Sequence, residues 1–324
     1  MLRVFMPGQW SDEALRELEG SLAQDVELIS CVHRTDDYEM LVCGRPGREM
    51  LEAPSLRWHV VPWAGLPAST RELLADFPHL SVHNLHHNAP AAAELAVGLL
   101  LAAAKRIVLA DKNLRQGDWS IRYSPENAML IGGSRILVVG MGEIGGRVAR
   151  VCRAMGAEVV GIARHVEEGE ARKGVPVLPP EALDGQLPGI DVLVLCVPLT
   201  DETRGMIDAR RLAAMPEEAV LVNVGRGGLV EEAALYEALR DGEIGAAGID
   251  VWYSYPRSVE SRRDTRPSRF PFHELDNVVM SPHRGGAMNV SELELLRARE
   301  LARLINAAAG GGPVPHRVDP ELGY

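Results

Sequence analysis

The sequence predicts an α/β protein whose larger part is a parallel, doubly wound sheet. From residue 136 onward, short apolar runs alternate with helical or turn-rich segments, as in successive βαβ units. The first run, residues 136–139, leads directly into Gly140-x-Gly142-x-x-Gly145 and then into a segment with helical spacing. A strand, a glycine-rich turn, a helix and a second strand in this order favour a dinucleotide site over an ordinary strand–turn–helix.

Each glycine of this motif has a separate physical task. Gly140 permits the tight turn, Gly142 lets the backbone approach a pyrophosphate, and Gly145 lets the helix pack closely on the strand. The free N–H groups at the start of the helix, where Glu143 and Ile144 lie, are expected to face the phosphates.

Further strands are predicted at regular intervals along the same region. The full set is residues 136–139, 158–162, 191–196, 219–223, 246–250 and 277–280. Ligands of such sheets bind at the carboxyl ends of the strands, so functional side chains are expected just after each strand. The unusual residues do lie there: Pro198 to Thr200, Arg226 between glycines, Asp250, and His283 after a proline.

The first part of the chain predicts a smaller α/β unit. Apolar runs at 2–6, 26–31, 40–43 and 80–83 read as strands, and a strand from Val60 ends in a loop at Gly65. Ser11, followed by two acidic residues, predicts the start of a helix that reaches Leu22. A long alanine-rich helix is predicted over 91–109, and a charged amphipathic helix over 291–309.

Length and composition limit the class of protein. The 324 residues suffice for two domains, and the net charge of −11 argues against a nucleic-acid or anionic-membrane surface. The longest apolar stretch, 95–104, is too short to span a bilayer, and no signal peptide is visible. We therefore expect a soluble cytoplasmic protein. The four cysteines form no CxxC pair and are expected to be reduced: Cys31, Cys43, Cys152 and Cys196.

Histidines are concentrated before the alanine-rich helix, which raises the question of a metal site. They are His79, His83, His86 and His87. No HExxH or Cys/His spacing accompanies them, and the only nearby carboxylate is Glu94. We predict no metal and interpret them as loop or cleft-lining residues.

Two side chains that follow predicted strands carry candidate chemistry. Arg226 could grip a carboxylate with two hydrogen bonds, although a helix-capping or solvated arginine is the alternative. His283 can exchange a proton near neutral pH, although a loop histidine with no catalytic role is the alternative. Asp250 could accept a hydrogen bond from a carboxamide or simply cap a turn.

Taken together, these motifs resemble the D-2-hydroxyacid dehydrogenase family. The resemblance is close from about Ala93 to Gly286 and thinner over the first 60 residues. It covers VVGMGEIGG at 138–146, CVPLT at 196–200, VNVGRGGLV at 222–230, AGIDV at 247–251 and SPHRGG at 281–286.

The resemblance implies two α/β lobes and a homodimer. A flavodoxin-like substrate domain would span 1–104 and be completed by 288–324, and a Rossmann-type NAD(P)-binding domain would span 105–287. Arg226 would bind and polarise a 2-oxo acid, and His283 would donate and accept the proton. The backbone of Trp63, Ala64 and Gly65 would hold the substrate carboxylate. The cofactor would be bound by Gly140, Gly142, Glu143, Ile144, Gly145, Arg164, His165, Val197, Pro198, Thr203, Val224, Gly225, Asp250 and Gly285.

One residue departs from the family's pattern. The family pairs its histidine with a carboxylate, or with a glutamine in formate dehydrogenases, but Tyr255 stands at that place here. The segment after it, 257–272, is long and basic, so Glu260 or Glu274 could supply the carboxylate instead. If neither does, His283 lacks its anionic partner.

The second strand of the nucleotide unit predicts which nicotinamide is used. An NAD site places an acid at the end of that strand to bind the ribose hydroxyls. Ala163 stands there instead, and Arg164 and His165 follow it. We therefore predict NADP, with a site that accepts either cofactor, including NAD, as the alternative.

The predicted activity is hydride transfer between NAD(P)H and a small 2-oxo or 2-hydroxy acid. An alternative is oxidation of a small anion such as formate, which tolerates a non-acidic partner to the histidine. A non-catalytic nucleotide sensor is a third interpretation, since fold alone does not give function. The presence of both Arg226 and His283 argues against that third interpretation.

Overall fold

The chain folds into two compact units. The computed structural model describes residues 1–30, 37–123, 128–286, 290–320 and 323. Unit 1 comprises Met1–Asn88 and Ala287–Tyr324, and unit 2 comprises Ala89–Gly286. The sequence prediction placed the first division after residue 104, but the structure divides the chain before the helix Ala89–Ala104. That helix packs on the strands of unit 2, which is why it belongs there.

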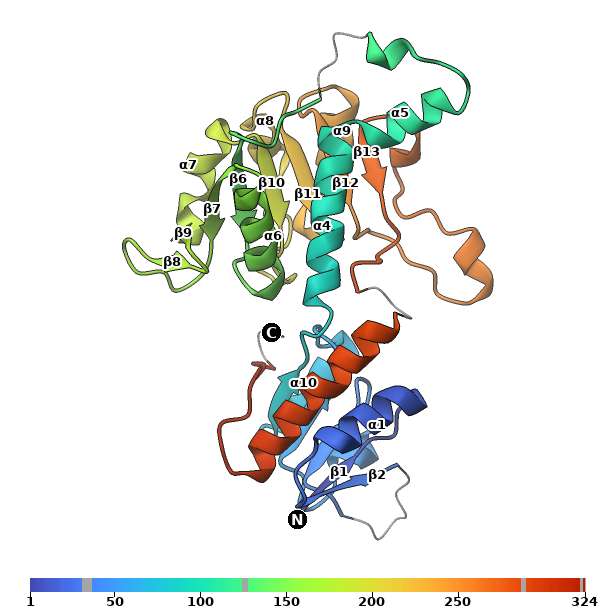
Figure 1. Cartoon of the computed structure of the whole chain (residues 1–324), viewed down its shortest axis with the longest axis vertical. Coiled ribbons are helices and arrows are strands. Elements are labelled where there is room, and N and C mark those ends of the chain that lie inside the picture. Colours follow the sequence, from blue (N-terminus) through green and yellow to red (C-terminus); the bar gives the residue numbers. More distant parts are fainter. Residues whose placement is uncertain (31–36, 124–127, 287–289, 321–322, 324) are drawn as a thin grey trace. The chain divides into compact units, whose positions relative to one another are not determined.

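Unit 2 is built on an eight-stranded sheet in the order β13-β12-β11-β10-β6-β7-β9-β8 (Figure 1). Its strands are β6 (Arg135–Val139), β7 (Glu158–Ile162), β8 (Ala171–Arg172), β9 (Val175–Leu178), β10 (Val192–Leu195), β11 (Val220–Asn223), β12 (Ala246–Ile249) and β13 (Val278–Met280). All neighbours pair in parallel except β8 with β9. The predicted doubly wound sheet is confirmed, and the short β8–β9 hairpin was not predicted.

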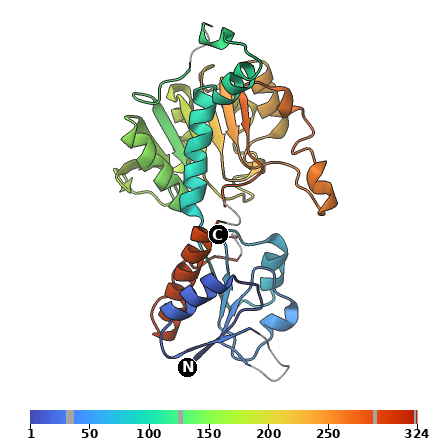
Figure 2. The same ribbon diagram turned by 45° about the vertical axis from the view of Figure 1, so that its right-hand side comes forward.

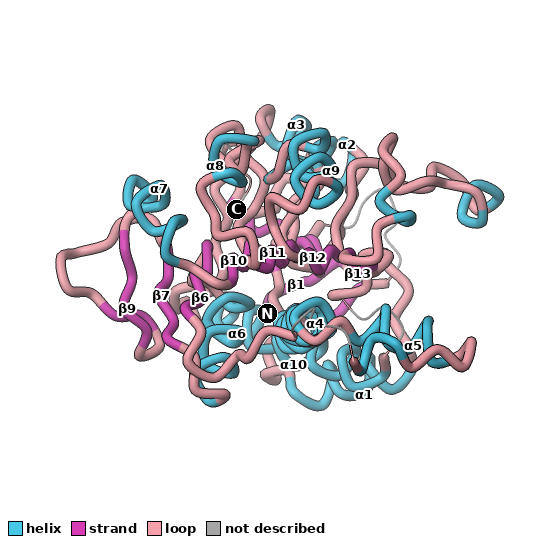
Figure 3. Tube along the Cα trace, turned by 90° about the horizontal axis from the view of Figure 1, so that it is seen from above, coloured by secondary structure: helices cyan, strands magenta, loops and turns pink. Residues whose placement is uncertain are grey.

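Helices cover both faces of this sheet (Figure 3). The α-helices of unit 2 are α4 (Ala89–Ala104), α5 (Ile107–Leu114), α6 (Glu143–Ala154), α7 (Leu183–Gln186), α8 (Ala209–Ala213) and α9 (Glu232–Arg240). Helices α4 and α6 lie on one face, and α7, α8 and α9 on the other. The single helix predicted over 91–109 is wrong, because the chain breaks at Arg106, whose φ of 53° is left-handed.

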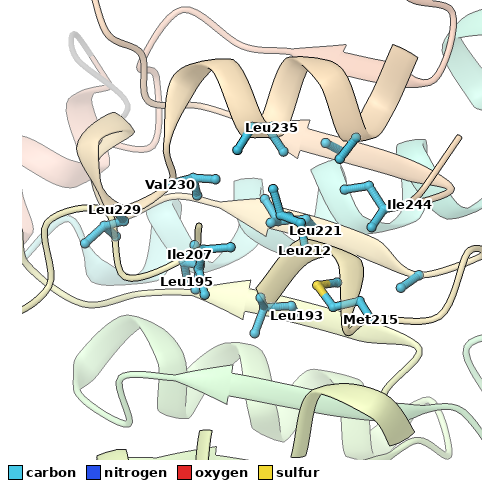
Figure 4. Packing of buried hydrophobic residues seen from close by; sticks show 14 of the residues in the cluster. Leu193, Leu195, Ile207, Leu212, Met215, Leu221, Leu229, Val230, Leu235 and Ile244 are labelled. Carbon is cyan, nitrogen blue, oxygen red and sulfur yellow. The ribbon is translucent and has the colours of Figure 1, made fainter. Parts of the chain in front are cut away.

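Alternation along the strands supplies a separate core to each face. In β10, Leu193 and Leu195 join the apolar cluster beneath α8 and α9, as Figure 4 shows. Val192 and Val194 point the other way, into the cluster with α4 and α6. Successive side chains of a strand face opposite sides, so a continuous apolar run is what a sheet covered on both faces requires.

Unit 1 has a five-stranded parallel sheet in the order β2-β1-β3-β4-β5. The strands are β1 (Leu2–Phe5), β2 (Val26–Ile29), β3 (Met40–Val42), β4 (Trp58–Val61) and β5 (Ser81–Asn84); the helices are α1 (Asp12–Ser21), α2 (Arg48–Leu51), α3 (Ala68–Leu74) and α10 (Ser291–Ala309). This is the flavodoxin-like strand order. Helix α10 lies against α1, so the end of the chain completes the unit (Figure 2).

Ser11 caps α1 as predicted, since its hydroxyl accepts a hydrogen bond from the Ala14 N–H at 3.2 Å.

Cys43, Cys152 and Cys196 are free thiols, and Cys31 lies outside the described residues. Burial raises the pKa of Cys152 to about 11 and that of Cys196 to about 12. Within the described part of the chain, no helix is long and apolar enough to cross a membrane.

Candidate active site

The glycine-rich turn of unit 2 joins β6 to α6 in a geometry that suits a dinucleotide. Gly140 has a φ of 98°, which residues other than glycine rarely adopt. A Cβ on Gly145 would lie 1.9 Å from the Gly140 carbonyl oxygen, so only glycine fits there. A Cβ on Gly142 would meet nothing within 4 Å, and no side chain caps α6. The first N–H groups of α6, around Ile144, are therefore available for a phosphate. The residues fit the pyrophosphate of a dinucleotide.

Basic side chains surround the edge of this turn. The carboxylate of Glu143 pairs with Arg147 and, at 3.1 Å, with the Lys173 ammonium. These partners lower the pKa of Glu143 to about 2. Lys173 lies in the turn of the β8–β9 hairpin and also donates to the Gly142 carbonyl at 3.2 Å. Sequence reasoning missed this contact, because the hairpin brings Lys173 back over a turn far earlier in the chain.

The hairpin is also fixed to the end of β7. The guanidinium of Arg172 donates to the backbone carbonyls of Arg164 at 3.0 Å and His165 at 2.8 Å. Ala163, where an NAD site has an acid, is buried. The end of β7 therefore carries basic residues from two segments.

Arg226 follows β11, and close packing explains the glycines beside it. A Cβ on Gly225 would lie 2.6 Å from the Val197 carbonyl oxygen, and one on Gly227 would lie 2.4 Å from that of Trp252. Neither glycine has a positive φ, so these glycines permit close approach of the backbone and do not form a left-handed turn. The Arg226 side chain donates to its neighbouring carbonyl at 2.7 Å and remains exposed. Among the residues that the structure describes, no carboxylate forms an ion pair with it.

Asp250 organises the segment that carries His283. Its carboxylate accepts hydrogen bonds from the Ser281 hydroxyl, from the Arg284 N–H at 2.7 Å and from the Gly285 N–H at 2.8 Å. It is 1% exposed. A Cβ on Gly285 would lie 2.9 Å from the same carboxylate, which explains the glycine. Asp250 therefore has a structural role here, whatever it does for a cofactor.

His283 lies near Arg226 and Tyr255 in a strained backbone conformation. Its φ is 56°, which is uncommon outside glycine and is frequent at functional sites. Partial burial of the ring and the charge of Arg226 lower the pKa of His283 below its ordinary value, and the Asp250 carboxylate opposes this shift. The neutral imidazole is thus favoured at neutral pH.

Tyr255 is the aromatic neighbour of His283. The two ring centroids are 5.5 Å apart, and the Tyr255 hydroxyl accepts a hydrogen bond from the Trp252 N–H at 2.9 Å. Burial raises the pKa of Tyr255, so its phenol is neutral. Neither Glu260 nor Glu274 is among the charges that shift the pKa of His283. The structure thus places a tyrosine beside His283, in the register the sequence favoured.

The remaining predicted residues lie in two places. Thr203 donates to the Pro198 carbonyl at 2.7 Å, which closes the loop after β10, and Val224 is buried at the end of β11. The loop of Trp63 and Gly65 follows β4 in unit 1. Among the histidines after β4, His83 is held by a protein group, since its Nδ1 donates to the Pro315 carbonyl at 2.7 Å. Within the described residues, no three His, Cys, Asp or Glu side chains are grouped to hold a metal ion.

Comparison with known proteins identifies the family. The model of the D-isomer specific 2-hydroxyacid dehydrogenase NAD-binding domain matches residues 97–285, which contain the glycine motif, Arg226 and His283. The chain belongs to this family.

Relatives within the family differ in name and length. The chain is 36% identical over 237 residues to a glyoxylate reductase of Korarchaeum cryptofilum, a match that covers 71% of this chain and 66% of that protein. It is 35% identical over 196 residues to a D-3-phosphoglycerate dehydrogenase of Methanocaldococcus jannaschii, covering 60% of this chain and 35% of that one. The match therefore spans about two thirds or less of these relatives.

Solved structures of the family agree in fold with both units. A D-isomer specific 2-hydroxyacid dehydrogenase from Xanthobacter autotrophicus, in complex with NADPH and MES, has a TM-score of 0.79 and 27% identity. That comparison covers 100% of this chain and 99% of the other. A glyoxylate/hydroxypyruvate reductase from Sinorhizobium meliloti has the same fold, with a TM-score of 0.77 and 22% identity over both full chains.

The neutral Tyr255 beside His283 leads to a prediction for the pH dependence of reductive kcat/KM. If His283 supplies the proton during reduction of a 2-oxo acid, reductive kcat/KM should fall as pH rises through the pKa of His283, which burial and the Arg226 charge hold below its ordinary 6.5. Tyr255→Glu places an anion beside the ring, which raises that pKa and should move the fall upward by about one pH unit or more. The pH profile of NAD(P)H consumption measures both midpoints.

Tyr255→Phe is the matched control, because it keeps the ring and removes only the hydroxyl. Its midpoint should stay near that of the unmodified chain. A reductive plateau that extends beyond about pH 8 in the unmodified chain would show that another carboxylate pairs with His283.

Proposed function

We propose that this chain is an NAD(P)-dependent D-2-hydroxyacid dehydrogenase that reduces small 2-oxo acids. The observation that carries the proposal is the placement of Arg226 after β11 and His283 after β13, close enough for the arginine's charge to shift the pKa of the histidine. A cation that can bind an anionic substrate and an imidazole that can donate or accept a proton are thus combined at one sheet edge.

Each residue has a distinct role in the proposed reaction. A nicotinamide dinucleotide, whose pyrophosphate the glycine turn and the start of α6 would hold, would supply the hydride when bound. Arg226 binds the 2-oxo acid through its planar guanidinium and stabilises the oxyanion that grows on C2. His283 gives its proton to that oxygen, and in the reverse direction takes it back. The backbone of Trp63, Ala64 and Gly65 would bind the substrate carboxylate.

The deciding experiment monitors NAD(P)H absorbance with a panel of 2-oxo acids and, with the oxidised cofactors, formate. Turnover of one or more 2-oxo acids supports the proposal. Turnover of formate alone favours a small-anion dehydrogenase, whose reaction is compatible with a non-acidic neighbour of His283 such as Tyr255. Binding of the cofactor with no turnover of any compound favours a nucleotide sensor and overturns the proposal.

We also propose that NADPH is the preferred cofactor. The adenosine ribose of a dinucleotide binds at the end of the second strand, here β7, where the acid of an NAD site is replaced by Ala163. Arg164 lies there, and the β8–β9 hairpin adds Lys173 at the same edge. Both can form charge-assisted hydrogen bonds to a 2′-phosphate. Lys173 also offsets the charge of Glu143, the nearest acid of the glycine turn.

Removing either cation should reduce the preference for NADPH. Arg164→Ala and Lys173→Ala are each expected to lower the ratio of kcat/KM for NADPH to that for NADH by about 10- to 100-fold, the value of a charged hydrogen bond. Arg210→Ala, on exposed α8, is the control and should leave the ratio unchanged. A preference of the unmodified chain for NADH would refute the proposal, as would an unchanged ratio in both variants.

Exposed apolar side chains on and after α5 support a homodimer. Ile107 and Val108 are 51% and 50% exposed, and Trp119 and Tyr123 further along are 60% and 78% exposed. Large apolar groups gathered on one segment mark protein interfaces. We propose that a second copy of the chain covers this segment.

A further inference from the structure

The loop of Trp63, Ala64 and Gly65 is fixed in unit 1 by a buried amide. Asn84, the last residue of β5, is 4% exposed, and its Nδ2 donates to the Ala64 carbonyl at 2.8 Å. The neighbouring Leu85 N–H lies 3.4 Å from the Trp63 carbonyl. Two successive carbonyls of the loop are therefore held from the end of one strand.

The side chain of Trp63 is fixed independently. Its ring lies so close to Gly44 that a Cβ there would be 1.9 Å from the ring. The carbonyl of Gly44 in turn accepts a hydrogen bond from the buried Thr70 hydroxyl at 2.9 Å. The loop is thus held at the indole by Gly44 and at the Ala64 carbonyl by Asn84.

Asn84 is itself held by the C-terminal segment, residues 315–318. Its backbone N–H donates to the His316 carbonyl at 3.1 Å, and the Val318 N–H donates to the Val82 carbonyl at 2.8 Å. His83 and Arg317 form an antiparallel bridge between these bonds. The C-terminal segment therefore lies along the outer edge of β5 and covers what would otherwise be an unpaired strand.

One carboxylate ties this segment to the rest of unit 1. Glu300 of α10 pairs with the His316 ring at 3.1 Å, and the same oxygen accepts the His86 N–H at 2.9 Å. The rings of His86 and His316 meet edge to face, with centroids 5.0 Å apart. The C-terminal segment, α10 and the residues after β5 thus form one connected network, with Asn84 at the end nearest the loop.

We infer that Asn84 is a positioning residue that sets the loop 63–65 for the substrate carboxylate, and that the C-terminal segment holds Asn84 in place. This inference rests on the proposed function. A buried amide bonded to a carbonyl fixes the adjoining peptide planes, and therefore the N–H groups on the far side of those planes. Backbone donors bind a carboxylate well only if their directions are already set.

The test is Asn84→Leu, which removes the donor at similar volume. KM for the 2-oxo acid should rise about tenfold, the effect of one hydrogen bond, while the dissociation constant of NADPH, read by its fluorescence, stays the same. Hydrogen exchange at residues 63–65 should accelerate. Deleting residues 313–324 should change KM and exchange in the same direction.

Asn277→Leu is the matched control. Asn277 also uses its amide to bond carbonyls, those of Leu239 at 2.9 Å and Gly245 at 3.3 Å, but it lies in unit 2. It should lower the melting temperature without raising KM for the 2-oxo acid. If Asn84→Leu does not fold, Asn84→Asp removes the same donor with the same shape.

Two results would overturn the inference. One is an unchanged KM for the 2-oxo acid in a folded Asn84 variant. The other is unchanged hydrogen exchange at 63–65, which is measured without substrate and so decides the question even if no 2-oxo acid is turned over. Lack of turnover by the unmodified chain would refute the proposed function instead, and the two failures are therefore distinguishable.

Discussion

Replacing His283 is expected to lower kcat for 2-oxo acid reduction by about 10²- to 10⁴-fold, with little change in KM. The proton that His283 supplies is needed as negative charge grows on the substrate oxygen, so its loss affects the transition state more than binding. Stopped-flow or steady-state absorbance of NADPH measures both constants.

The choice of substitution follows from the backbone. At a φ of 56°, a residue with a Cβ carries a backbone strain of about 1–2 kcal/mol, and asparagine adopts this left-handed region more readily than alanine does. His283→Asn is therefore the cleaner variant, because it removes the titrating group and keeps the loop. An equal loss in His283→Ala and His283→Asn would assign the effect to the proton. Wild-type turnover in His283→Asn would show that another group is the acid.

Arg226→Lys is expected to lower kcat/KM by about 10²- to 10³-fold, with both KM and kcat affected. Lysine keeps the positive charge but loses the planar pair of donors that can grip a carboxylate or oxyanion. The substitution also removes the bond from the guanidinium to the Gly225 carbonyl, which helps to direct the side chain. Steady-state kinetics with varied 2-oxo acid measure the loss.

Arg240→Lys is the control for this substitution. Arg240 is exposed, forms an ion pair with its neighbour Asp241 and lies over the Tyr236 ring, away from Arg226 in the sequence, so the change should leave kcat/KM within about twofold. If Arg226→Lys matched the control, charge alone would suffice, and the proposed bidentate contact would be wrong.

Most of the nucleotide-binding unit could be predicted from the sequence. Strands buried on both faces appear in the sequence as unbroken apolar runs, and glycines are needed where the backbone turns or approaches a ligand. The sequence therefore predicted β6, the turn at 140–145 and α6. The helix 291–309 was predicted at its observed bounds, because its apolar stripe repeats at the helical period. These features depend on residues close in sequence.

Predictions failed at one helix boundary and where a segment distant in the sequence decided the packing. The helix expected over 91–109 breaks at Arg106, although the local composition favours helix throughout. The division between units lies before α4 because that helix packs on β11 and β12, which come more than a hundred residues later. The β8–β9 hairpin has only a short Lys173-Gly174 turn as its signal in the sequence.

The sequence by itself determined the fold class, the glycine turn and the identity of the candidate acid and cation, because each is encoded in a contiguous motif. Only the tertiary structure decided which side chains surround them. It placed Lys173 on the glycine turn and Asn84 on the Ala64 carbonyl. Such contacts join residues far apart in the chain, and the packing of whole strands and helices fixes their geometry. A local sequence pattern does not predict that packing.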